Sequence, residues 1–144
     1  MNELRQRIAR RHQIVGWWGL FVFLALGFAL ETLHGFKMGF YLDPEHRLRR
    51  LLWTLAHAHG TLLALVQITF AFTVGSLGRW TERRLKLVSF LLIDGLVLLP
   101  VGFFLGGIGH TEVDPSMGVL LVPIGAVLLL IAVGLIAWSL TRGE

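Results

Sequence analysis

Two histidines, His57 and His59, lie inside the apolar stretch "WTLAHAHGTLLALVQITFAF" (residues 53–72). An imidazole surrounded by hydrocarbon is costly unless its ring nitrogens have partners. Such a histidine binds a metal ion or haem iron, relays protons, or forms hydrogen bonds within the protein. The residue types therefore point to ligand binding, proton transfer or a buried hydrogen bond at this position.

A second group with ligand chemistry is "ETLH", in which Glu31 and His34 are three residues apart and project from one face of a helix. Glu-x-x-His is the spacing by which bundle helices present a carboxylate and an imidazole to a metal ion. A Glu–His pair at a solvated helix end explains the same spacing without a metal. Because several ligand-type residues are predicted at one level, we expect metal ligands from this set: Glu31, His34, His57, His59 and His110.

His57 and His59 are predicted to face different sides of their helix, because two residues correspond to a rotation of about 200°. His57 shares its side with a small and polar stripe that should face the bundle interior: Thr54, Gly60, Thr61, Ala64 and Gln67. His57 is therefore predicted to be a ligand or a hydrogen-bonding residue within the chain. His59 lies on an apolar stripe and needs a haem pocket, a neighbouring subunit or a backbone carbonyl.

Asp94, in "LLIDGLVLLP", is a further ionisable residue within an apolar run. Asp94 and Gln67 each lie about eight residues from the same end of their runs, which places both roughly 12 Å deep. We expect the two side chains to be neighbours that share a hydrogen bond. The alternative is a proton relay that links Asp94 to the histidines.

Four apolar runs must position these residues, at about 14–33, 51–77, 87–108 and 118–140. The chain has 144 residues, of which 55% are hydrophobic and 15% charged, and a membrane span needs about 20 apolar residues. Little of the chain remains outside the runs. The sequence therefore predicts one all-α domain over residues 1–144, an integral membrane four-helix bundle.

The charged residues flank these runs and predict an orientation. Arginines precede the first run and follow the second, whereas the last connection, "GHTEVDPSMG", has acids and no Lys or Arg. The positive-inside bias then places both termini in the cytoplasm, in what we expect to be a bacterial inner membrane. The net charge of +4 is assigned to anionic lipid headgroups and not to nucleic acid. We also expect a homo-oligomer or a subunit of a larger membrane complex.

The first residues of the chain suggest an additional element. Leu4, Ile8, Arg11 and Val15 recur about one helical turn apart, with arginines elsewhere. This pattern predicts a short helix at the headgroup level before the chain turns into the membrane.

The stretch "AHAHGTLLALVQITFAF" resembles the second transmembrane helix of haem–copper oxidase subunit I, over about a dozen residues of one span. In that family the histidine of a His-Gly pair is an axial ligand of the low-spin haem, which the resemblance assigns to His59, followed by Gly60. The family subunit has many more spans, and this chain lacks the helices that carry the copper ligands. The resemblance therefore implies a small cytochrome b or a metal-binding relative and does not imply oxygen reduction.

These observations lead to one principal hypothesis and two alternatives. The principal hypothesis is a small membrane protein that binds haem b or a transition-metal ion (copper, iron or zinc) near the outer leaflet, with a redox, electron-transfer or metal-handling role. The absence of cysteine excludes thiolate ligands and covalent c-type haem. The alternatives are a non-catalytic subunit or oligomeric channel with structural histidines, and a proton-coupled transporter.

Overall fold

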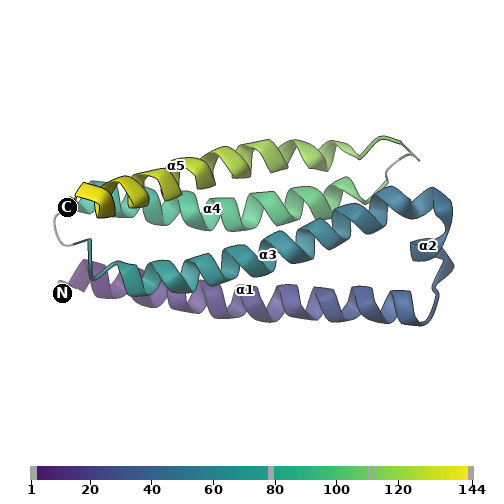
Figure 1. Ribbon diagram of the computed structural model, residues 1–144, viewed down its shortest axis with the longest axis horizontal. Helices are drawn as coiled ribbons and strands as arrows, with labels where there is room; N and C mark the ends of the chain where they lie inside the picture. Colours follow the sequence, from purple (N-terminus) through teal and green to yellow (C-terminus); the bar gives the residue numbers. More distant parts are fainter. Residues whose placement is uncertain (1–2, 78–79, 110, 112, 143–144) are drawn as a thin grey trace.

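The chain folds into long antiparallel helices, as the computed structural model shows for residues 3–77, 80–109, 111 and 113–142 (Figure 1). Within these residues there is helix and no strand. The long helices are α1 (Glu3–Gly35), α3 (Arg47–Thr73), α4 (Glu82–Gly106) and α5 (Leu121–Arg142). The short elements are α2 (Gly39–Leu42), η1 (Pro44–His46) and η2 (Met117–Leu120).

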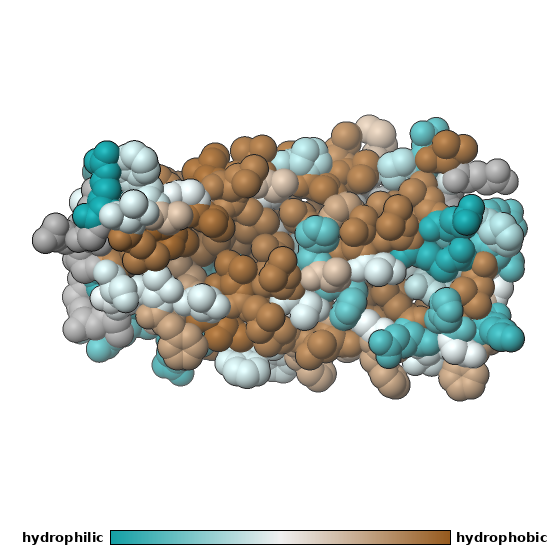
Figure 2. Space-filling view, viewed as in Figure 1, coloured by the Kyte–Doolittle hydropathy of each residue, from teal (hydrophilic) through white to brown (hydrophobic). Residues whose placement is uncertain are grey.

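Four of the helical segments are long and apolar enough to cross a membrane. Figure 2 shows apolar side chains over the middle of one face and hydrophilic side chains gathered toward both ends. The all-helical class and four candidate spans in the described residues are therefore as the sequence predicted.

The long helices are arranged as an open row. α1 packs on α3, α3 on α4 and α4 on α5, while α1 reaches α4 over a small area only. In the described part of the chain the backbones of α1 and α5 do not come into contact. The start of α1 and the end of α5 lie at one end of the row, called here the terminal end, and α2 lies at the opposite α2 end (Figure 1).

Local sequence explains how α4 begins and how α5 approaches it. The Thr81 hydroxyl accepts a hydrogen bond from the Arg84 amide at 3.3 Å and caps the helix. Gly125 brings α5 close, since a Cβ atom there would lie 2.8 Å from the Leu99 amide nitrogen. The hydrophobic core of the bundle is made chiefly of buried aliphatic side chains, among them Leu77, Leu85, Val88, Leu92, Leu96 and Leu129.

The prediction of a separate interfacial helix at the start of the chain is wrong. α1 is one unbroken helix of 33 residues. Its first turns are held against the other helices because Arg5, Ile8 and His12 are buried. The amphipathic pattern of these turns therefore reflects packing against protein.

Candidate functional site

A cavity of about 230 Å³ opens between α1, α2 and α3 at the α2 end. α1 and α3 spread apart toward this end, and α2 lies across the opening (Figure 1). The cavity brings together three of the predicted ligand residues, and its lining is Gly27, Leu30, Glu31, His34, Tyr41, Thr54 and His57.

His57 is held at the inner part of this cavity by α1. Its Nδ1 donates a hydrogen bond to the Phe23 carbonyl oxygen at 2.7 Å. Its ring occupies the space beside Gly27, where a Cβ atom would lie 2.7 Å from Nδ1 and 2.9 Å from Nε2. Because the proton of the neutral ring is on Nδ1, the lone pair of Nε2 remains for a ligand. The inward position of His57 agrees with the polar stripe that predicted it.

Glu31 and His34 lie farther toward the α2 end than His57. Gly27, which contacts His57, precedes Glu31 by one turn and His34 by about two turns, or roughly 6 and 10 Å along the axis. Among the described residues, no three His, Cys, Asp or Glu side chains approach closely enough to hold a metal ion. The expected convergence of these side chains on one ion is therefore not present in the described residues, because they occupy successive helical turns. His110 lies outside the described residues.

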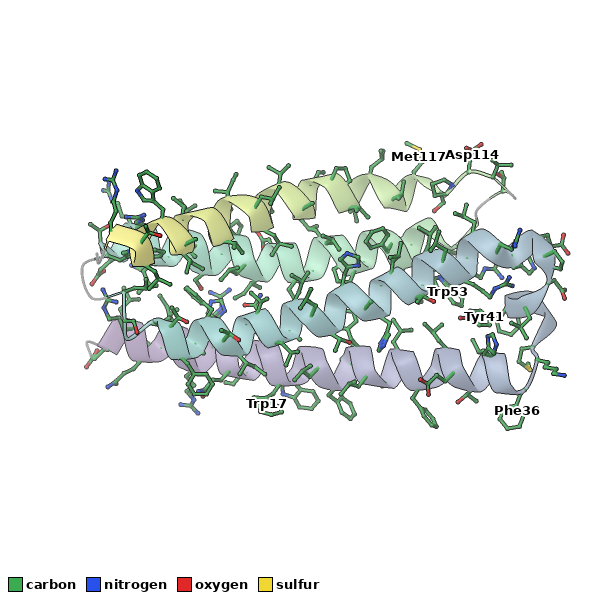
Figure 3. All side chains as sticks on the ribbon, viewed as in Figure 1. Trp17, Phe36, Tyr41, Trp53, Asp114 and Met117 are labelled. Atoms are coloured by element: carbon green, nitrogen blue, oxygen red, sulfur yellow. The ribbon has the colours of Figure 1, made fainter. Side chains whose placement is uncertain are left out.

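An aromatic stack supports the wall of the cavity. Tyr41 is buried and stacks on Trp53, with ring centroids 6.3 Å apart, and the two lie side by side in Figure 3. Trp53 stacks in turn on Phe104 at 5.2 Å and donates its indole N–H to the Phe104 carbonyl at 3.1 Å. Arg50 donates to the Tyr41 carbonyl at 2.8 Å. These contacts join the cavity wall to α3 and α4.

His59 lies on another side of α3 and does not line the cavity. Its Nδ1 donates to the Leu55 carbonyl of its own helix at 2.9 Å, and its ring lies 5.1 Å from that of Phe103. The sequence left open a haem pocket, a neighbouring subunit or a backbone carbonyl as the partner of His59. The bond to Leu55 is the backbone carbonyl. The space beside Gly60 is filled by the Phe23 ring, which a Cβ atom at Gly60 would overlap.

Gln67 does not form the predicted hydrogen bond with Asp94. Its Nε2 donates to the Leu92 carbonyl at 2.7 Å, and its Oε1 accepts from Nδ1 of His12 at 2.5 Å. Asp94 follows Leu92 by two residues and therefore points to another side of α4. The similar depth of Gln67 and Asp94 did not predict a bond between them, because depth does not determine which face of a helix a side chain occupies.

His12 is the polar residue that sequence reasoning missed. It is fully buried and joins α1 to α3 and α4, because its second ring nitrogen, Nε2, lies 2.8 Å from Oγ of Ser89. The orientation of Gln67 assigns the proton of His12 to Nδ1, so Nε2 accepts from the Ser89 hydroxyl. Both ring nitrogens are occupied, which makes His12 a hydrogen-bonding residue. The spacing of Arg5, Ile8, His12 and Gly16, three or four residues apart, was the available signal of a buried stripe.

Comparisons with protein families, with curated proteins and with solved structures find no match for this chain. The class that the structure defines is an all-helical protein with four helices able to span a membrane.

Proposed function

We propose that this chain is an integral membrane protein that binds a transition-metal ion in the cavity between α1 and α3. The ligands are His57, Glu31 and His34, and the role is redox, electron transfer or metal handling. The membrane is a bacterial inner membrane, with both termini in the cytoplasm and the cavity near the outer leaflet.

The observation that carries this proposal is the fixed imidazole of His57 in a cavity that also contains a carboxylate and a second imidazole. A hydrogen bond from one ring nitrogen to a carbonyl is the usual way in which proteins orient a histidine ligand. Glu31 and His34 are exposed and free to change rotamer. Helical side chains tilt toward the helix N-terminus, which for α1 is the direction of His57.

The dimensions of the cavity favour an ion over a porphyrin. Pockets for drug-sized ligands span about 300–1,000 Å³, and this cavity has about 230 Å³. The Phe23 ring also covers Gly60, the position where the oxidase resemblance would place a haem edge. Imidazole and carboxylate without thiolate suit copper(II), iron or zinc. Ligands on successive turns favour transient binding and transfer of the ion, which is metal handling.

The test is a titration of the purified, metal-free protein with Co²⁺, Cu²⁺ and Zn²⁺, with an absorption scan for a Soret band. We expect saturable metal binding and no Soret band. His57→Ala and Glu31→Gln should each weaken binding by about tenfold or more. His59→Ala is the matched control, because His59 also bonds a carbonyl of the chain but lies outside the cavity. Equal affinity in the wild type and both cavity variants would exclude the metal site.

A second candidate function, subunit of a larger membrane assembly or homo-oligomer, is favoured by Asp94. This residue is at the midpoint of α4, about 18 Å from either end. It is partly buried, and the exposed apolar residues of its stripe are Leu87, Phe90, Val97 and Val101. No hydrogen bond or ion pair to Asp94 is present among the described residues. A carboxyl group at this depth is expensive in lipid, so a polar group of another subunit is its expected partner.

Asp94→Leu tests this candidate in mild detergent, by sedimentation and by crosslinking in membranes. The variant should retain the helix content of the wild type and lose its association with other subunits. Glu82→Gln, which changes an exposed carboxylate at the start of the same helix, should associate normally. A wild-type protein that is monomeric and uncrosslinked would contradict the subunit role.

A further inference from the structure

A second cavity, of about 310 Å³, lies at the terminal end between the first turns of α1 and α4. Three of its lining side chains are cationic, Arg7 and Arg11 from α1 and Lys86 from α4. The other three are the apolar Leu4 and Ile8 and the hydroxyl of Ser89. The metal site at the α2 end uses none of these residues.

The cations of this cavity differ from other basic residues of the same end. Arg5 donates to the carbonyls of Val74 and Leu77 at 3.1 and 2.7 Å, and Arg84 lies over the Trp80 ring at 4.6 Å. These two arginines therefore have structural roles, because their side chains contact other parts of the protein.

Arg7 and Arg11 have no such structural role. In the described residues neither forms an ion pair or a hydrogen bond. They are spaced i, i+4 on one helix, where two like charges repel. The only ion pair of Lys86 there is with Glu82 at 3.6 Å, and both side chains are more than half exposed. Such a pair contributes little. Three positive charges around one cavity are thus available to an anion.

The apolar residues of the cavity favour a lipid over a free anion. Leu4 and Ile8 line the cavity beside the three cations. A phosphate held by the cations would therefore place the apolar part of a lipid against apolar side chains of α1. Ser89 donates its hydroxyl to His12, at 2.8 Å, so the cavity's donors to a phosphate are the three cations. Basic pockets between helices at the cytoplasmic surface are a known type of site for anionic headgroups.

We propose that Arg7, Arg11 and Lys86 bind the phosphate group of an anionic phospholipid at the terminal end of the bundle. The proposal rests on membrane insertion of the four helices and is independent of the metal site. It assigns one bound lipid to a defined place, beyond a general attraction of basic flanks to the membrane surface.

The test measures bound lipid by native mass spectrometry of the full chain in neutral detergent, titrated with phosphatidylglycerol or with phosphatidylcholine. We expect one saturable phosphatidylglycerol site and none for phosphatidylcholine. Each lost cation should weaken binding roughly fivefold, so Arg7→Gln/Arg11→Gln should weaken it about 25-fold. Arg10→Gln/Arg83→Gln removes the same charge from exposed positions outside the cavity and should change the affinity less than twofold.

Three outcomes would overturn the proposal. Equal weakening in both double variants would mean general electrostatic attraction, and tight binding of inorganic phosphate without preference for the lipid would mean a free-anion site. No saturable lipid in the wild type would mean no site. Flotation of the wild type with neutral vesicles checks insertion separately. If Arg7→Gln/Arg11→Gln loses helix content, Lys86→Gln, which changes a mostly exposed side chain, replaces it.

Discussion

The imidazole of His12 and the carboxamide of Gln67 are 2.5 Å apart, from Nδ1 to Oε1, and both side chains are completely buried. Gln67 also bonds the Leu92 carbonyl, and His12 also bonds Ser89. One chain of hydrogen bonds thus links α1, α3 and α4 at the terminal end. In an apolar setting such a chain stabilises the arrangement only when every member has its partners.

His12→Ala is expected to destabilise the protein by about 1–3 kcal/mol, because Gln67 and Ser89 would each retain a buried polar group without a partner. The measurement is the free energy of unfolding from a denaturant titration followed by circular dichroism. The triple variant His12→Leu/Gln67→Leu/Ser89→Ala removes both partners of each bond that His12 makes and should lose less unfolding free energy than His12→Ala. Gln13→Ala, at an exposed neighbouring position, should match the wild type.

Arg5→Gln is expected to cost about 2–4 kcal/mol, because Arg5 donates to three carbonyls, including that of Trp80 at 3.1 Å. Arg5→Lys should recover only part of the loss, since an ammonium group cannot reproduce the planar fork. Hydrogen exchange of the amides of residues 74–77 is the local measurement, and it should accelerate in both variants. Arg10→Gln is the control, and exchange that is unchanged in Arg5→Gln would contradict the role of Arg5.

Gly27→Ala should displace the His57 ring, because the added Cβ atom would lie within 2.7 Å of Nδ1. We expect a loss of about 1–3 kcal/mol in unfolding free energy, together with weaker metal binding. Gly134→Ala is the matched control in α5, where no atom lies within 4 Å of the added Cβ. That variant should be neutral or more stable by up to about 1 kcal/mol. Similar effects of the two substitutions would argue against the close packing of His57 on α1.

The proposed orientation, with both termini in the cytoplasm, predicts opposite labelling of two single-cysteine variants, Val113→Cys and Glu3→Cys. The chain has no cysteine of its own, so each variant carries one thiol. Val113 is 80% exposed in the connection between α4 and α5, and Glu3 is exposed at the terminal end. An impermeant maleimide should label Val113→Cys in intact cells and label Glu3→Cys only after permeabilisation. The reverse labelling pattern would contradict this orientation and place both termini outside the cell.

The sequence predicted the helical class and the side of α3 that carries His57 because hydrophobic periodicity and run length are local properties. Residues 14–33 lie within α1 (Glu3–Gly35), and the residues of α1 before that run are helical too. There the charge of Arg5 is satisfied by carbonyls from residues 74–80. Such a contact between distant residues has no local signature. The partner of Gln67 was missed for the same reason, since the rotation of α4 about its axis depends on packing.

The sequence anticipated part of the candidate site. Of the five residues predicted as ligands, Glu31, His34 and His57 line one cavity, His59 lies elsewhere on α3, and His110 lies outside the described residues. The distance from His57 to Glu31 and His34 depends on the axial position of α3 relative to α1. The contact of His57 with Gly27 determines that position. His59 is excluded because it lies on another side of α3, where its ring packs near Phe103.

The open row of helices also implies an order of assembly during synthesis. Each long helix packs on the long helix before it in the chain, so α1 and α3 can pair as soon as both are made. The His57 bond to Phe23 and the His12 bond to Gln67 belong to this first pair. Gln67 and His12 each lack one partner until α4 brings the Leu92 carbonyl and Ser89. The arrival of α4 is therefore the step that completes the buried polar network, and α5 can be added afterwards without disturbing it.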